Sequence, residues 1–151
     1  MSRLKSGSAD EALFVHSMPG HYIRRMQQVA VRLFAEHVEG DMTPVQFAAL
    51  SALADSPDIG QAALAALIGY DRATIGGVID RLETKGHVRR RADPDDRRSN
   101  ILSLTDTGRA ALETARPQVE AVQEKLLGPL SASERIVYER LCRTILAANG
   151  G

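Results

Sequence analysis

Arginine side chains gather in the middle of this 151-residue chain, where they could bind phosphates or the edges of bases. The chain has no net charge, because 19 Lys and Arg residues balance 19 Asp and Glu residues. The segment from Arg72 to Arg98 is nevertheless basic, with eight Lys or Arg against five Asp or Glu. A guanidinium group binds a phosphate or a guanine edge through two parallel hydrogen bonds. A basic segment in an acidic remainder is typical of a nucleic-acid site, although arginines clustered on a solvated surface give the same pattern.

The segment 71–85 has the pattern of a helix whose exposed side is small or basic. Asp71 can cap this helix and Gly86 ends it, and we expect its first turns to enter the major groove of DNA. The adjacent Gly76 and Gly77 cost roughly 1 kcal/mol each relative to Ala. Close approach of DNA explains them, and so does tight packing against another helix. The residues of this helix predicted to contact DNA are Arg72, Ala73, Thr74, Gly77 and Arg81.

Two extended runs, 87–91 and 100–104, flank a turn at 93–96 and predict a β-hairpin with a charged tip. The first run holds three consecutive arginines, which cannot all be buried without partners. Such a tip suits the minor groove of DNA, whose negative potential attracts Arg, and Asp96 could brace the guanidinium of Arg98. The alternative is a solvated turn with local ion pairs. The hairpin residues predicted to contact DNA are Arg90, Asp96, Arg97 and Arg98.

The order of the predicted elements makes a winged helix-turn-helix. A short helix at 61–68, a turn at 69–70 and the helix 71–85 form the helix-turn-helix, and the hairpin that follows is the wing. Further helices are expected from Gly20, from Thr43, from Thr105 and from Ser131, and Pro117 should bend or interrupt the third of these. The fold class is therefore mainly α with a small β-hairpin wing, a winged helix-turn-helix domain plus a helical dimerisation region.

Four segments follow from this pattern, and the helices outside the winged domain indicate a homodimer. We expect a flexible N-terminal arm at 1–17, a first helix for dimerisation and ligand binding at 18–42, a winged domain at 43–105 and C-terminal dimerisation helices at 106–151. A second copy would cover the apolar faces of the terminal helices and place two recognition helices about 34 Å apart, which suits a palindromic site. The alternative is a bundle that covers those faces within one chain.

Composition and motifs exclude several other classes. The single Cys142 allows no disulfide framework, and its place in the last helix suggests a packing role. The spacing of the four His residues does not match a metal site, and the sequence contains no cofactor-binding motif. It also has no set of nucleophile and base residues at a spacing typical of an enzyme, so we do not expect catalysis. No apolar run is long enough for a membrane span, so we expect a soluble cytoplasmic protein with no membrane partner.

The wing and its flanks resemble one known family. The stretch 93–108 fits the D-x-R-x5-L-T…G wing signature of the MarR family of bacterial winged helix-turn-helix regulators, and 71–74 and 81–86 resemble its recognition helix and the exit from it. The resemblance covers nearly all of the chain. It implies a dimer joined by the terminal helices, with Arg98 in the minor groove and Asp96 as its orienting partner. The residues on the fixed positions of the signature are Asp96, Arg98, Leu104, Thr105 and Gly108.

The first helix suggests where an effector binds. Its opening, 19–28, is similar to family members that control breakdown of aromatic acids, some of which respond to the CoA thioester. A pocket between the first two helices would use His21 or an Arg for a carboxylate or phosphate. The alternative is that these side chains only pack. The predicted ligand-binding residues are His21, Tyr22, Arg25, Met26, Val29, Phe47 and Leu50.

These observations predict a dimeric regulator of transcription that binds a palindromic operator in double-stranded DNA. We expect a repressor that a small anionic or aromatic ligand releases, such as an aromatic acid or its CoA thioester. The alternative is a winged-helix module that binds proteins and has no sequence-specific DNA binding.

Overall fold

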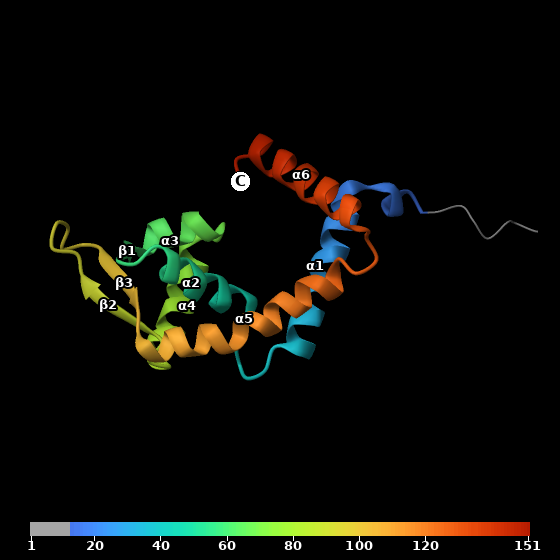
Figure 1. Ribbon diagram of the computed structural model, residues 1–151. Helices are drawn as coiled ribbons and strands as arrows, with labels where there is room; N and C mark the ends of the chain where they lie inside the picture. Colours follow the sequence, from blue (N-terminus) through green and yellow to red (C-terminus); the bar gives the residue numbers. More distant parts are fainter. Residues whose placement is uncertain (1–12) are drawn as a thin grey trace, which may run out of the picture.

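A computed structural model describes residues 13–151 as a small sheet at one end of the molecule, helices packed beside it, and long helices that lead away from it (Figure 1). A short 3-10 helix, η1, precedes the first long helix, so the last part of the predicted arm is ordered locally, while residues 1–12 of that arm lie outside the described range. The elements, in chain order, are η1 (Phe14–Ser17), α1 (Pro19–His37), α2 (Pro44–Asp55), β1 (Ile59–Gly60), α3 (Gln61–Ile68), α4 (Arg72–Thr84), β2 (Val88–Ala92), β3 (Asn100–Leu104), α5 (Asp106–Leu126) and α6 (Ala132–Ala148).

Side-chain caps begin four of these helices. Thr43 and Ser131 each form a full capping box with the residue three positions on, and the hydroxyl of Thr105 accepts a hydrogen bond from the backbone N–H of Gly108 at 3.0 Å. Asp71 caps α4 in the same way, and Gly69, with φ of 69°, closes α3 in the left-handed conformation. The short link between Gly69 and Asp71 thus fixes the turn of the helix-turn-helix.

The core of the winged domain is built from aliphatic side chains of α2, α3, α4, the sheet and the start of α5. The sheet is antiparallel in the order β1-β3-β2, and Val88 of β2 lies opposite Leu104 of β3. The sequence predicted the hairpin but not β1, because a two-residue strand beside a Ser-Pro-Asp turn has no alternating pattern to detect. The fully buried side chains of this core include Leu50, Leu53, Leu64, Ile75, Ile79, Leu82, Leu102 and Leu112.

Gly108 lets α5 start directly against the end of the helix-turn-helix. A Cβ at this position would overlap the backbone carbonyl of His87, so only glycine permits the contact. The hydroxyl of Thr105 also donates to the carbonyl of Gly86 at 2.6 Å. These contacts explain two positions of the wing signature, Thr105 and Gly108, on packing grounds alone.

A second apolar cluster joins α1 to α5. It contains Phe34, Val38, Ala115, Val119 and Val122, with Phe47 of α2 packed against it. Pro117 lies inside α5 without interrupting it, and the helix bends near its middle (Figure 1). Of the two predicted effects of Pro117, a bend or a break, the structure therefore shows the bend, since the helix continues to Leu126.

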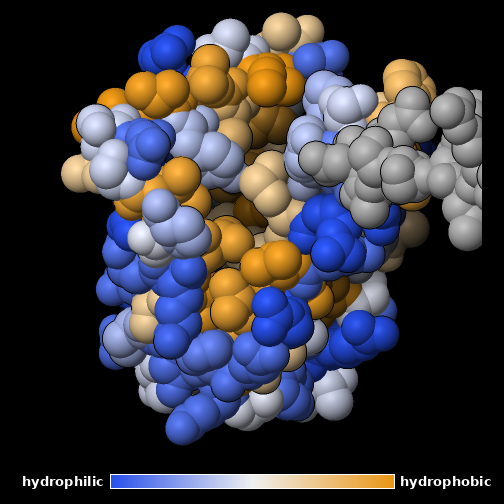
Figure 2. Space-filling view, turned by 90° about the vertical axis from the view of Figure 1, so that its right-hand side faces the viewer, coloured by the Kyte–Doolittle hydropathy of each residue, from blue (hydrophilic) through white to orange (hydrophobic). Residues whose placement is uncertain are grey.

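Helix α6 begins beside α1, at the end of the molecule away from the sheet, runs back in the direction of the winged domain, and buries none of its residues (Figure 1). Figure 2 shows this side of the molecule, where apolar residues gather around a hollow in the surface. Among residues 13–151, no single helix is long and apolar enough to cross a membrane; α3 and α4 reach that limit only when taken together across a bend of 111°. The large apolar residues left exposed on α1 and α6 include Tyr22, Ile23, Met26, Ile136, Val137, Leu141, Ile145 and Leu146.

Candidate nucleic-acid interface

The residues predicted from the recognition helix share one exposed side of α4. The opposite side of the helix is buried through Ile75, Val78, Ile79 and Leu82, so the 3.6-residue period separates the two sides cleanly. The exposed side presents small side chains at its N-terminal end and a cation further on. Its members are Arg72, Ala73, Thr74, Gly77, Asp80, Arg81 and Thr84.

Asp71 holds Thr74 in a fixed orientation at the start of α4. One carboxylate oxygen of Asp71 accepts from the backbone N–H of Thr74 at 2.8 Å, and the other accepts from its hydroxyl at 2.6 Å. These hydrogen bonds from Thr74 lower the pKa of Asp71 below its ordinary value. Because the hydroxyl proton is committed to Asp71, Thr74 can offer a base edge its methyl group and an acceptor lone pair.

The two central glycines of α4 have different surroundings. A Cβ on Gly77 would meet nothing within 4 Å, whereas a Cβ on Gly76 would lie 3.4 Å from Nε2 of Gln61 in α3. Helix packing therefore gives no reason for glycine at position 77. The open space above Gly77 lies on the exposed side of α4, where a groove wall can come close to the helix backbone.

Aspartates fix the backbone of the wing tip. The carboxylate of Asp93 accepts from the N–H of Asp95 at 2.9 Å, and that of Asp96 accepts from the N–H of Arg98 at 2.9 Å. The sequence predicted that Asp96 braces the guanidinium of Arg98, and this detail is wrong. A carboxylate two residues before a backbone N–H closes a local Asx turn, which leaves the guanidinium free. Within residues 13–151, Arg97 and Arg98 are exposed and form no ion pair.

Arg90 makes contacts inside the chain. Its guanidinium lies 2.7 Å from Oδ1 of Asp80 and 3.5 Å from Oε2 of Glu83, both on α4, and only a quarter of its side chain is exposed. The predicted DNA residue Arg90 thus ties strand β2 to the recognition helix. Its neighbour Arg91 pairs with Asp58 at 3.1 Å. Asp80 and Glu83 were not predicted as site residues, because no local sequence pattern pairs a carboxylate on α4 with an arginine on β2.

Known proteins share this architecture. Residues 40–99 match the model of the MarR family. The chain is 34% identical to the HTH-type transcriptional repressor NicR of Pseudomonas putida over 84% of this chain and 81% of NicR.

The chain belongs to the MarR family.

Two solved structures support the same assignment at the level of the fold. The PcaV regulator of Streptomyces coelicolor, in complex with its natural ligand, is 33% identical and covers 91% of this chain and 98% of its own, with a TM-score of 0.86. BpsR of Bordetella bronchiseptica, whose DNA binding is regulated by 6-hydroxynicotinic acid, is 32% identical over 83% of this chain and 96% of its own, with a TM-score of 0.79. This MarR-family protein is a DNA-binding regulator of transcription and not an enzyme.

The predicted ligand residues of this MarR-family chain do not form one group. Arg25, Met26 and Val29 line a cavity of about 470 Å³ between α1 and the turn from α5 to α6. Phe47 packs against the C-terminal end of α1, and Leu50 is fully buried in the winged-domain core. Because α1 rises about 1.5 Å per residue, Phe34 beside Phe47 lies roughly 12 Å along the helix from Met26. The other residues lining the cavity are Leu126, Leu127, Pro129, Leu130 and Tyr138.

His21 and Tyr22, which lie at the start of α1, do not line that cavity. The ring of His21 stands 5.3 Å from that of His16 and 6.1 Å from that of Tyr22, and Nδ1 of His21 is 3.3 Å from Nη2 of Arg24. Loss of solvent around the ring and the charge of Arg24 lower the pKa of His21, which favours its neutral form. Arg25 is therefore the stronger partner for an anion. Within residues 13–151, no group of three His, Cys, Asp or Glu side chains is placed to hold a metal ion.

Proposed function

We propose that this protein is a homodimeric repressor that binds a palindromic operator and is released from it by a small aromatic acid. The observation that carries the DNA part is the pairing of two free basic surfaces in one domain. The exposed side of α4 and the tip of the wing both present arginines without ion pairs among residues 13–151, Arg81 on the helix and Arg98 on the wing. Membership of the MarR family supports the role as a regulator, and these two surfaces are its proposed contacts with DNA.

In this proposal α4 enters the major groove and the wing reaches the adjacent minor groove. Thr74, Gly77 and Arg81 face base edges, and Arg98 enters the minor groove from a tip whose backbone Asp96 holds rigid. Arg72 and Arg97 add charge toward the phosphates. A rigid tip lowers the ordering cost of binding, because the loop around Arg98 loses less conformational freedom.

The partner of the proposed dimer is a second copy of this chain. Helix α6 has no buried residue, and Leu141, Ile145 and Leu146 are all about half exposed or more. These apolar side chains stay uncovered within one chain, which supports a second copy, rather than a one-chain bundle, as their partner. Gel filtration at micromolar concentration should give about twice the chain mass of 16.4 kDa. A mass near one chain would contradict the dimer.

The proposed effector site is the cavity beside Arg25. Its walls are mainly apolar, with Met26 and Val29 on one side and Tyr138 on another, and Arg25 supplies one cation at its edge. A flat ring with a carboxylate matches that combination, because apolar walls take the ring and a guanidinium takes the anion in two hydrogen bonds. Regulation of the relative BpsR by 6-hydroxynicotinic acid supports this class of ligand.

A fluorescence-anisotropy titration with the DNA upstream of the protein's own gene tests both parts. We expect tight, salt-sensitive binding that one member of a panel of aromatic acids and their CoA thioesters abolishes. Arg25→Gln should keep operator binding and weaken release, whereas the control Arg32→Gln should change neither, since Arg32 pairs with Glu36 away from the cavity.

The other outcomes of this titration are informative. Operator binding that no member of the panel changes would contradict the proposed effector class and would support the proposal of operator binding. Binding no stronger than to unrelated DNA would contradict the operator proposal and favour the protein-interaction module.

A further inference from the structure

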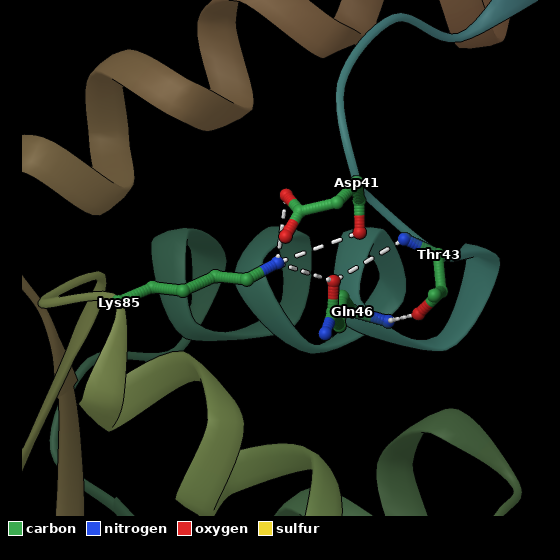
Figure 3. Close-up of polar contacts among 4 residues, drawn as sticks. All are labelled: Asp41, Thr43, Gln46 and Lys85. Carbon is green, nitrogen blue, oxygen red and sulfur yellow. Dashed lines mark hydrogen bonds and ion pairs between the residues drawn. The ribbon is translucent and has the colours of Figure 1, made fainter.

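The end of the recognition helix is tied to the loop between α1 and α2 by one lysine (Figure 3). Nζ of Lys85, the C-terminal cap of α4, lies 2.9 Å from Oδ1 of Asp41 and donates to the backbone carbonyl of Asp41 at 3.4 Å and to Oε1 of Gln46 at 3.3 Å. These partners are 44 and 39 residues away along the chain. The contact therefore closes a long-range link that no local pattern specifies.

Both side chains that accept from Lys85, those of Gln46 and Asp41, favour a cationic donor. Gln46 in α2 is 3% exposed, and its Oε1 also accepts from the backbone N–H of Thr43 at 3.2 Å. A buried amide oxygen with a second lone pair needs a second donor, which Lys85 supplies. The hydrogen bond and the charge of Lys85 lower the pKa of Asp41 below its ordinary value, so this carboxylate is ionised at neutral pH.

The same loop is anchored at its other end to α5. The backbone N–H of Glu39 donates to Oε1 of Gln118 at 2.9 Å, and Val38 is buried in the cluster that joins α1 to α5. Lys85 thus connects the recognition helix, through a loop of a few residues, to the helices outside the winged domain.

We infer that Lys85 is a positioning residue for operator binding: it fixes the C-terminal end of α4 to the α1–α2 loop and does not itself bind DNA. A lysine ammonium has three N–H donors, and three acceptors lie within 3.4 Å of this one. No donor remains for a phosphate. The position of Arg81, one helical turn before Lys85 on α4, depends on this anchor. The inference rests on operator binding by α4, which titration of the unmodified protein measures separately.

Charge-removing variants on both sides of the link distinguish positioning from direct contact. Lys85→Met and Asp41→Asn are titrated with operator and with unrelated DNA at several salt concentrations, and thermal melts confirm that both variants are folded at the assay temperature. Positioning predicts that each variant weakens operator binding about threefold to tenfold, the range that loss of a partly exposed, charge-assisted contact gives. The double variant should lose no more than the larger single loss, because the two changes remove one link.

The sign of the Asp41→Asn effect decides the matter. If Lys85 bound a phosphate, removing the nearby carboxylate would leave operator affinity equal or higher, and Lys85→Met would reduce the salt slope by about 1. Positioning predicts a loss for Asp41→Asn with the salt slope unchanged in both variants. Unchanged operator binding by both folded variants would show that the link is only structural and would overturn the inference.

Discussion

Removal of the Arg90 guanidinium is the perturbation whose result depends most directly on the tertiary structure. Arg90→Met leaves Asp80 and Glu83 without their cation on the helix that faces DNA, and it releases β2 from α4. Two-thirds of the Asp80 side chain is exposed, so solvent screens the pair and its net contribution to folding is about 0.5–1 kcal/mol. Near DNA the same two carboxylates repel phosphates and water is partly excluded, so we expect about a tenfold loss of operator affinity, or about 1.4 kcal/mol.

A double-mutant cycle with Asp80→Asn tests the cause of that loss. If Arg90 acts by neutralising and holding Asp80, then Asp80→Asn removes the charge on which Arg90 acts. The loss of operator affinity caused by Arg90→Met should then fall to less than half of its value in the unmodified protein. Operator affinity is measured by fluorescence anisotropy at three or more salt concentrations. Arg89→Met is the matched control, because Arg89 is an exposed neighbour on the same strand with no ion pair among residues 13–151.

One result would refute this reasoning. If Arg90→Met loses the same affinity with and without Asp80→Asn, and its salt slope falls by about 1, Arg90 neutralises a phosphate directly. The sequence-based prediction of Arg90 as a DNA contact would then be correct, and the ion pair to α4 would be a feature of the free protein only.

Three further changes test other parts of the interface. Arg98→Ala should weaken operator binding by about 1–3 kcal/mol and lower the salt slope, and equal binding in an anisotropy titration would remove the wing from the interface. Gly77→Ala should raise the free energy of unfolding by up to about 1 kcal/mol in urea denaturation, because its Cβ meets no atom, while weakening operator binding; a gain in both would mean that DNA does not approach this backbone. The depressed pKa of Asp71 adds stability that is present above its ordinary value of 3.8 and lost as pH falls through the lower folded value. Asp71→Asn should therefore flatten the decline of melting temperature with acid below about pH 4, and an unchanged acid profile would exclude this contribution.

Local sequence determined the elements and the class of protein. Caps at Thr43, Asp71 and Ser131 act on residues at most three positions away, and the left-handed Gly69 needs only its own missing Cβ. The period of α4 likewise separates its buried and exposed sides without reference to any other element. These interactions lie within one turn of helix, so residue order alone is enough to predict them.

The partners of charged side chains were decided only by the tertiary structure. Arg90 meets Asp80 ten residues away, and Lys85 meets Asp41 across 44 residues, so neither pairing has a periodic signal. Even the local Asp96 was assigned the wrong partner, because its carboxylate reaches a backbone N–H as easily as a guanidinium and only the folded turn chooses between them. The cavity beside Arg25 likewise brings together α1, the end of α5 and α6, which lie about a hundred residues apart in the chain. Sequence fixes which groups are charged and which face of each helix is apolar, whereas distances between elements follow from how their apolar faces pack together.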